Sequence, residues 1–243
     1  MKALTFAGRN IKEILRDPIN LAFGLGFPLA LIGLLSAIQA NIPVALFTLP
    51  QLAPGIAVFG LSFLTLFSAT MIAKDRSSAF LQRLYTTPMG AKDFILGYTL
   101  PIIPIAILQS AICYLAALLL GLTFSINILY AICAIVPISV LYIAIGLLCG
   151  SVLNDKQVGG VCGALLTNLS AWLSGIWFDL DLIGGVFKEI ADCLPFIHAV
   201  QLQRAILAGN FAAIFPHIWW VLGYSIVLLT AAVLLFLRQM KRQ

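Results

Sequence analysis

The stretch "AKDRSSAFLQRLYTTPMGAKDF", residues 73–94, gathers four basic and two acidic residues between two long runs that carry no charge. Of the 243 residues in the chain, 62% are hydrophobic and 9% are charged, whereas a soluble domain carries about 25% charged residues. A soluble core could not bury so much apolar surface. Because a backbone in lipid must satisfy its own hydrogen bonds, the sequence predicts an all-α integral membrane protein, formed as one membrane domain over residues 1–243.

Six uncharged stretches are long enough to cross a bilayer, which takes about 20 mostly apolar residues. Every Asp, Glu, Lys, Arg and His lies outside these stretches, as expected when a charge at mid-membrane costs at least ~2.5 kcal/mol. Pro101, Pro104 and Pro137 predict kinks or tilts in the third and fourth stretches. We therefore predict six transmembrane helices, at about residues 21–39, 53–73, 94–120, 126–153, 158–178 and 218–237.

The basic residues are divided unevenly between the two sides of this predicted topology. Twelve of the fourteen lie in the N-terminal segment, in residues 73–94, in the short loop at 154–157 and at the C-terminus, and only Lys188 and Arg204 lie on the other side. The positive-inside rule then places both termini in the cytoplasm and the chain in the cell membrane. The net charge of +5 follows from this orientation, and no basic patch on a water-soluble face points to nucleic acid.

Two further segments are predicted to be helical without crossing the membrane. Residues 1–19 place apolar and basic side chains on different faces, which is typical of a helix lying in the cytoplasmic interface; a charged flank that only sets topology is the alternative. Before the last span, residues 183–193 and 195–207 predict two short amphipathic helices that re-enter the outer edge of the membrane or cap the bundle. The residues assigned to this outer segment are Pro195, His198 and Arg204.

The charged stretch itself predicts a short cytoplasmic helix from about Asp75 to Thr86, ended by Thr87 and Pro88. A loop that only sets topology would be the plain interpretation. Such a loop would not need Phe80 and its apolar neighbours, so we favour a docking helix for a soluble partner, with Asp75 near its start to suit the helix dipole.

Small and polar side chains recur at helical spacing in the predicted second and fifth spans. In a membrane such a stripe faces protein or a cavity, so helix packing and a translocation path both remain open. The residues assigned to a translocation path or dimer seam are Ser62, Thr65, Ser68, Gly163, Thr167, Asn168, Ser170 and Ser174. No span carries an ionisable residue, which argues against a proton-coupled carrier and favours an amphipathic or hydrophobic cargo, drug- or antibiotic-like.

Four motifs, in this order along the chain, resemble those of the ABC-2 type membrane subunits of ATP-binding-cassette exporters. They are "LRDP" (15–18) before an apolar run with "FP", "DR" and "LQRLYTTP" in the charged stretch, "LSGIWF" (173–178) and "LPFIHAVQLQRAILAGN" (194–210). The chain departs from the family pattern at three points. Ala79-Phe80 stands where Gly-Thr is common, Ser77 where an acid is common, and Asp179 where Pro is usual.

The resemblance implies a pair of membrane subunits, expected to be identical, each docking one copy of an ABC ATPase that binds ATP and Mg²⁺. This chain has no Gly-Lys dipeptide and so lacks the usual phosphate-binding loop; we expect no cofactor, metal or catalytic residue in it, and membrane lipids as its surroundings. The expected ATPase-coupling residues are Asp75, Arg76, Phe80, Arg83, Leu84, Asp155 and Lys156.

Three alternatives remain beside the drug-like exporter. The first is a lipid-linked glycan exporter of the same family, and the second is a stand-alone secondary carrier. A membrane enzyme is the third, but its candidate residues show neither metal-ligand nor triad spacing along the outer loop. Those candidates are Asp179, Asp181, Glu189, Asp192, His198 and His217.

Overall fold

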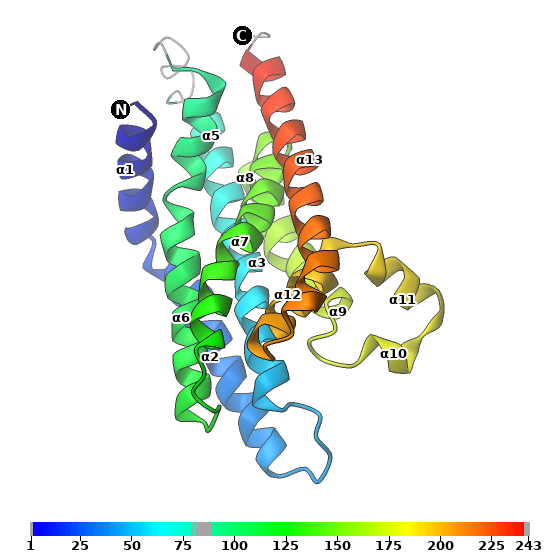
Figure 1. Cartoon of the computed structure of the whole chain (residues 1–243). Helices are drawn as coiled ribbons and strands as arrows, with labels where there is room; N and C mark the ends of the chain where they lie inside the picture. Colours follow the sequence, from blue (N-terminus) through cyan, green and yellow to red (C-terminus); the bar gives the residue numbers. More distant parts are fainter. Residues whose placement is uncertain (1, 79, 81–88, 241–243) are drawn as a thin grey trace.

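The computed structural model describes residues 2–78, 80 and 89–240, and all regular structure in this part of the chain is helical. Figure 1 shows a bundle of long helices with both ends of the chain at the same end of the bundle, which we call the terminal end. Among the described residues, five helices are long and apolar enough to cross a membrane. They are α2 (Pro18–Ala40), α3 (Leu49–Ser77), α5 (Ala91–Thr99) continued by α6 (Ile102–Leu119), α7 (Asn127–Val152) and α13 (Ile214–Met240).

Helix α3 is the centre of the bundle, because α2, α6, α7 and the short helix α12 (Pro195–Leu207) all pack against it. Its apolar side chains are largely buried, whereas α2 and α13 expose most of theirs. Phe23 of α2 and Trp219 of α13 are examples of these exposed apolar side chains. In a protein that spans a membrane, such faces contact lipid.

The predicted kink in the third span is confirmed, since α5 ends at Thr99 and α6 begins at Ile102, with Pro101 between them. Proline lacks the N–H that would continue the helical ladder and its ring crowds the preceding turn. Pro137, by contrast, lies inside an uninterrupted α7.

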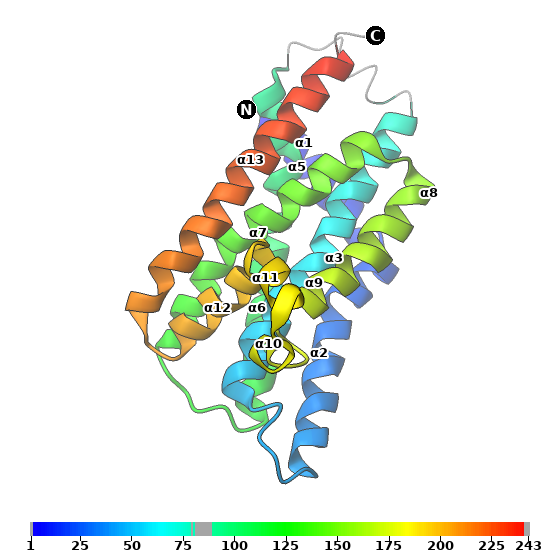
Figure 2. The same ribbon diagram turned by 90° about the vertical axis from the view of Figure 1, so that its right-hand side faces the viewer.

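The predicted fifth span, 158–178, differs from expectation. Three segments follow one another there: α8 (Asp155–Val158), the π-helix η1 (Gly159–Leu166) and α9 (Thr167–Leu173). Figure 2 shows this run from α8 to α9 beside α3. The run ends earlier than predicted because Gly175 turns the chain with a φ of 67°. The described residues therefore contain five helices long and apolar enough to cross a membrane, instead of the predicted six.

The N-terminal helix α1 (Lys2–Leu15) packs against α5. It buries Phe6, and Gly97 of α5 makes this approach possible, because a Cβ there would lie 2.1 Å from Phe6 Cδ1. The predicted apolar face is divided: Ile14 is buried in the bundle, while Leu4 and Leu15 are exposed.

Beyond α9 the chain forms α10 (Leu180–Ile183), α11 (Gly185–Asp192) and α12, followed by the short η2 (Phe211–Ala213) that leads into α13. Helices lie at both predicted positions, α11 within 183–193 and α12 over 195–207, whereas their entry into the outer edge of the membrane stays a prediction. Figure 1 shows α10 and α11 as an arm that projects from the side of the bundle, whereas α12 packs against α3, α7 and α13.

Candidate functional site

At the terminal end, a cluster around Asp75 ties three helices together. Arg9 of α1 donates from Nη1 to Asp75 Oδ2 at 2.9 Å and from Nη2 to Asp75 Oδ1 at 3.0 Å. Tyr98 of α5 donates its hydroxyl to Asp75 Oδ2 at 2.9 Å. A buried carboxylate is stable only with an opposite charge and hydrogen-bond donors around it. We call Arg9, Asp75 and Tyr98 the Asp75 cluster.

The Asp75 cluster also contacts Phe80, the only residue of 79–88 that the structure describes. The guanidinium of Arg9 lies 4.3 Å from the ring centroid of Phe80, a cation–π contact. Phe80 also lies beside Phe6, with ring centroids 6.4 Å apart. The beginning of the segment between α3 and α5 is thus attached to α1.

The predicted helix at about 75–86 lies mostly outside the described residues, but its start differs from the prediction. Residues 75–77 are the last turn of α3, and the chain becomes extended at Ser78. Asp75 is buried in the cluster, and Arg76 donates from Nη1 to the carbonyl oxygens of Gly150 at 2.8 Å and Leu153 at 3.2 Å, at the end of α7. These two side chains therefore hold helices of this chain together, and their assignment to ATPase coupling stays a prediction.

The other proposed coupling residues divide into two groups. Arg83 and Leu84 lie outside the described residues. Asp155 and Lys156 are exposed in the first turn of α8, at the same end of the bundle as the Asp75 cluster. Their turn is fixed by a capping box, in which the Asn154 and Gln157 side chains each accept a hydrogen bond from the other residue's backbone N–H.

Thr65 and Ser68 of the polar stripe in α3 face α7 within the same chain. Thr65 Oγ1 donates to the Tyr142 carbonyl at 2.8 Å, and Ser62 and Ser68 are fully buried. A Cβ on Gly146 of α7 would lie 1.7 Å from Ser68 Oγ. The small residues of this stripe let α3 and α7 approach each other closely, as is common between helices in membranes.

The stripe of the fifth predicted span is partly buried within the chain and partly exposed. Its buried part packs inside the chain: Ser170 Oγ lies 2.9 Å from the Tyr142 hydroxyl, and Thr167 and Ser174 bond to carbonyls of their own run. Asn168 lies on an exposed face, and Gly163 is partly exposed.

A cavity of about 690 Å³ lies between the arm, α12 and the start of α3. We call it the arm cavity. Arg204 of α12 lines it, half-buried, and donates from Nε to the Gln51 carbonyl at 3.2 Å and from Nη2 to the Gly175 carbonyl at 3.0 Å. Burial lowers the pKa of Arg204, and the Asp179 carboxylate partly opposes this shift.

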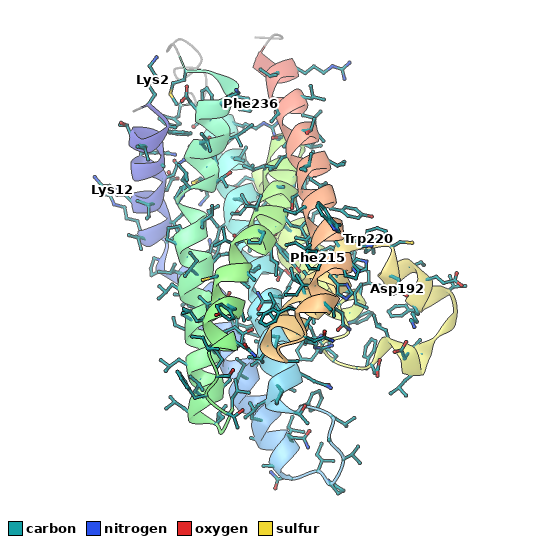
Figure 3. The ribbon with its side chains drawn as sticks, viewed as in Figure 1. Lys2, Lys12, Asp192, Phe215, Trp220 and Phe236 are labelled. Carbon is teal, nitrogen blue, oxygen red and sulfur yellow. The ribbon has the colours of Figure 1, made fainter. Side chains whose placement is uncertain are left out.

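A pair of histidines forms the wall of the arm cavity next to α13. His198 Nδ1 and His217 Nδ1 are 2.9 Å apart, and His198 Nε2 lies 2.9 Å from the Asp192 carbonyl. The His198 ring stacks on the ring of Trp220 in α13, with the two ring centroids 4.7 Å apart. Figure 3 labels Trp220 and also Asp192, the last residue of α11. Burial lowers the pKa of His198. His198 thus contacts both α11 and α13, and Arg204 contacts the start of α3. Pro195 is the first residue of α12.

Sequence reasoning missed the partners that give these residues their roles. Arg9, Tyr98 and Tyr142 were not singled out, because each acts on a residue far away in the chain. Asn10 on the otherwise amphipathic α1 was a usable signal, because a buried amide needs a hydrogen-bond partner. Asn10 is buried, and its Nδ2 donates to the Gly97 carbonyl of α5 at 3.0 Å. Among the described residues no group of three or more His, Cys, Asp or Glu could hold a metal ion.

A family model described as "ABC-2 family transporter protein" matches residues 44–234. The matched region runs from just before α3 into α13, and it contains the arm cavity and Asp75. No curated protein matches the chain.

Proposed function

The chain belongs to the ABC-2 transporter family, and from that premise we propose that it is the membrane-spanning subunit of an ATP-driven exporter. Proteins of this family are membrane transport components that associate with an ABC ATPase. The observation that carries the proposal is the family match over most of a chain with five long apolar helices.

In the proposed complex, the ATPase docks at the terminal end and hydrolyses ATP with its own Mg²⁺. The charged stretch supplies the contact, through Arg83 and Leu84, with Asp155 and Lys156 as a second contact. The Asp75 cluster supports this role indirectly, because it joins α1, α3 and α5 on either side of the stretch. A displacement of the stretch would move these three helices together.

The proposed topology completes six spans by counting the run from α8 to α9 as the fifth. Asp155–Leu173 is helical throughout and carries no charge after Lys156. Both termini lie in the cytoplasm of the cell, with α1 in the interface and its exposed Leu4 and Leu15 in lipid. The segment α10–α12 re-enters the outer edge of the membrane.

We assign the translocation path to the interface between two copies of this chain. The exposed face of α9, with Asn168 and Trp172, is apolar apart from the amide. No charge interrupts it, so it suits an amphipathic or hydrophobic, drug-like cargo. Two copies of the chain and two ATPase subunits form the proposed exporter.

Co-purification tests the proposal. An affinity-tagged chain is isolated in mild detergent from the membranes of its own organism, and bound proteins are identified. We expect an ABC ATPase with the wild type and its loss with Arg83→Glu plus Leu84→Asp. The matched control is Lys188→Glu on the arm, which should retain the ATPase. A folded wild-type chain that brings no ATPase would overturn the exporter assignment and favour the stand-alone carrier.

A further inference from the structure

The arm cavity has the size of a small-molecule site. Its volume of about 690 Å³ falls within the range of roughly 300–1,000 Å³ typical of ligand pockets. Buried apolar side chains form part of its wall, among them Leu52, Ile176 and Ile197, and Trp177 and Phe178 add aromatic faces. An apolar chain and a polar head could therefore both be accommodated.

One charge in this cavity lacks an ionic partner. Arg204 gives two of its five N–H groups to backbone carbonyls. Among the described residues, no carboxylate lies within ion-pair distance of it. Withdrawing a cation from water without a counter-charge is costly. An oxyanion on a ligand would supply the missing charge and could accept two hydrogen bonds from the guanidinium.

Carboxylates on the same cavity restrict which ligand fits. Asp181 is already paired with Lys188, which leaves Asp179 and Asp192. Asp179 stands directly after Trp177 and Phe178, whose rings favour a cation beside them. A purely anionic head would meet these carboxylates, and a purely cationic head would leave Arg204 without a counter-charge.

We propose that the arm cavity binds an amphipathic molecule whose head group is zwitterionic, with its anionic centre at Arg204 and its cationic centre at Asp179, Asp192 and the neighbouring rings. Phosphocholine-like and phosphoethanolamine-like heads have this chemistry, whether on a lipid or on a free amphiphile. As the description of a transported molecule, this rests on the proposed function. As a binding site, it can be measured on the chain without any ATPase.

The test measures binding to the full chain in dodecyl maltoside micelles, with Trp177 kept as the only tryptophan and the other three changed to Phe. Four probes share one brominated twelve-carbon chain, which quenches Trp177 when bound. Their heads are phosphocholine, phosphate, trimethylammonium and maltoside. We expect the phosphocholine probe to bind at least about tenfold more tightly than the other three.

Two variants change the charge selectivity in opposite directions. Arg204→Gln should weaken the phosphocholine and phosphate probes roughly tenfold and spare trimethylammonium. Asp179→Asn should weaken trimethylammonium and strengthen phosphate, and it keeps the side-chain oxygen that accepts from the Asp181 N–H at the start of α10. Arg16→Gln removes an exposed charge that does not line the arm cavity and serves as the control.

Opposite shifts in the two variants, with the control unchanged, would establish the site, because a folding defect cannot raise affinity for one head while lowering another. Equal binding of all four probes, or equal loss with both variants, would overturn the proposal. Probe binding without any ATPase in the co-purification would retain the site and refute the exporter. An ATPase without selective binding would do the reverse. A phosphatidylcholine-containing nanodisc that competes with the probe would indicate a lipid as the natural ligand, whereas no competition would indicate a free amphiphile.

Discussion

Removing Arg9 should destabilise the chain far more than removing any other charge on α1. The Arg9→Ala chain keeps a carboxylate at Asp75 that is 3% exposed and retains only the Tyr98 hydroxyl among its described side-chain donors. Breaking a buried ion pair in this way costs about 3–5 kcal/mol. Arg9 is 36% exposed, so water can replace part of the lost interaction, and we expect a loss of about 2–3 kcal/mol.

Asp75→Asn should cost less, about 1–2 kcal/mol, because Arg9 keeps its ion pair with Glu13 at 2.6 Å and needs no buried counter-charge. The double variant should lose less than the sum of the two single variants, with a coupling energy of roughly 1–2 kcal/mol. Arg16→Ala, an exposed charge near the end of the same segment, should change stability by less than about 0.5 kcal/mol.

The assay is unfolding of the purified chain in mixed micelles with an increasing fraction of sodium dodecyl sulfate, followed by circular dichroism. Strictly additive losses, or an Arg9→Ala chain as stable as Arg16→Ala, would refute the reasoning. The Asp75 cluster would then not join α1 to α3.

Two further changes test other contacts. Gly146→Ala should lower the stability of the purified chain by about 1–3 kcal/mol, because its Cβ would lie 2.6 Å from the Thr65 carbonyl oxygen. Gly33→Ala is the control, since its Cβ would have no neighbouring atom within 4 Å. Equal stability of the two variants would contradict the close approach of α3 and α7. Burial lowers the pKa of His198, so the unfolded chain takes up the proton first, and stability should fall as the pH drops below about 6.5. Unfolding at pH 7.5 and 5.5 should show a smaller loss for His198→Gln than for wild type, and equal losses would assign the effect to other groups.

Local signals along the chain predicted the elements they control directly. Pro101 interrupts the third span because its ring and missing N–H act within one turn. Pro195 suits the first position of α12, where its missing N–H is not needed. Gly209 lies just after the end of α12 and adopts a φ of 76°, which glycine tolerates best. The apolar runs gave the long helices because lipid demands them.

Other features depend on partners that sequence spacing does not reveal. Periodicity identified the face of α3 that carries Thr65, but not that α7 covers it. The charges from residue 74 onward indicated the end of a span, yet α3 continues to Ser77. The Asp75 carboxylate is stabilised there by an ion pair with Arg9, 66 positions away. The π-helical hydrogen bonding of η1 leaves no mark in composition. The arm cavity likewise arises only where α12 meets the arm.

The most direct test of the exporter assignment is transport into inverted membrane vesicles that contain the chain together with its co-purified ATPase. A fluorescent amphiphile with a phosphocholine head is supplied outside the vesicles, with and without ATP. We predict accumulation that requires ATP, withstands a proton uncoupler, and disappears when Arg83→Glu plus Leu84→Asp prevents ATPase binding. Accumulation that persists without ATP or the ATPase and collapses with the uncoupler would contradict the exporter and identify a secondary carrier.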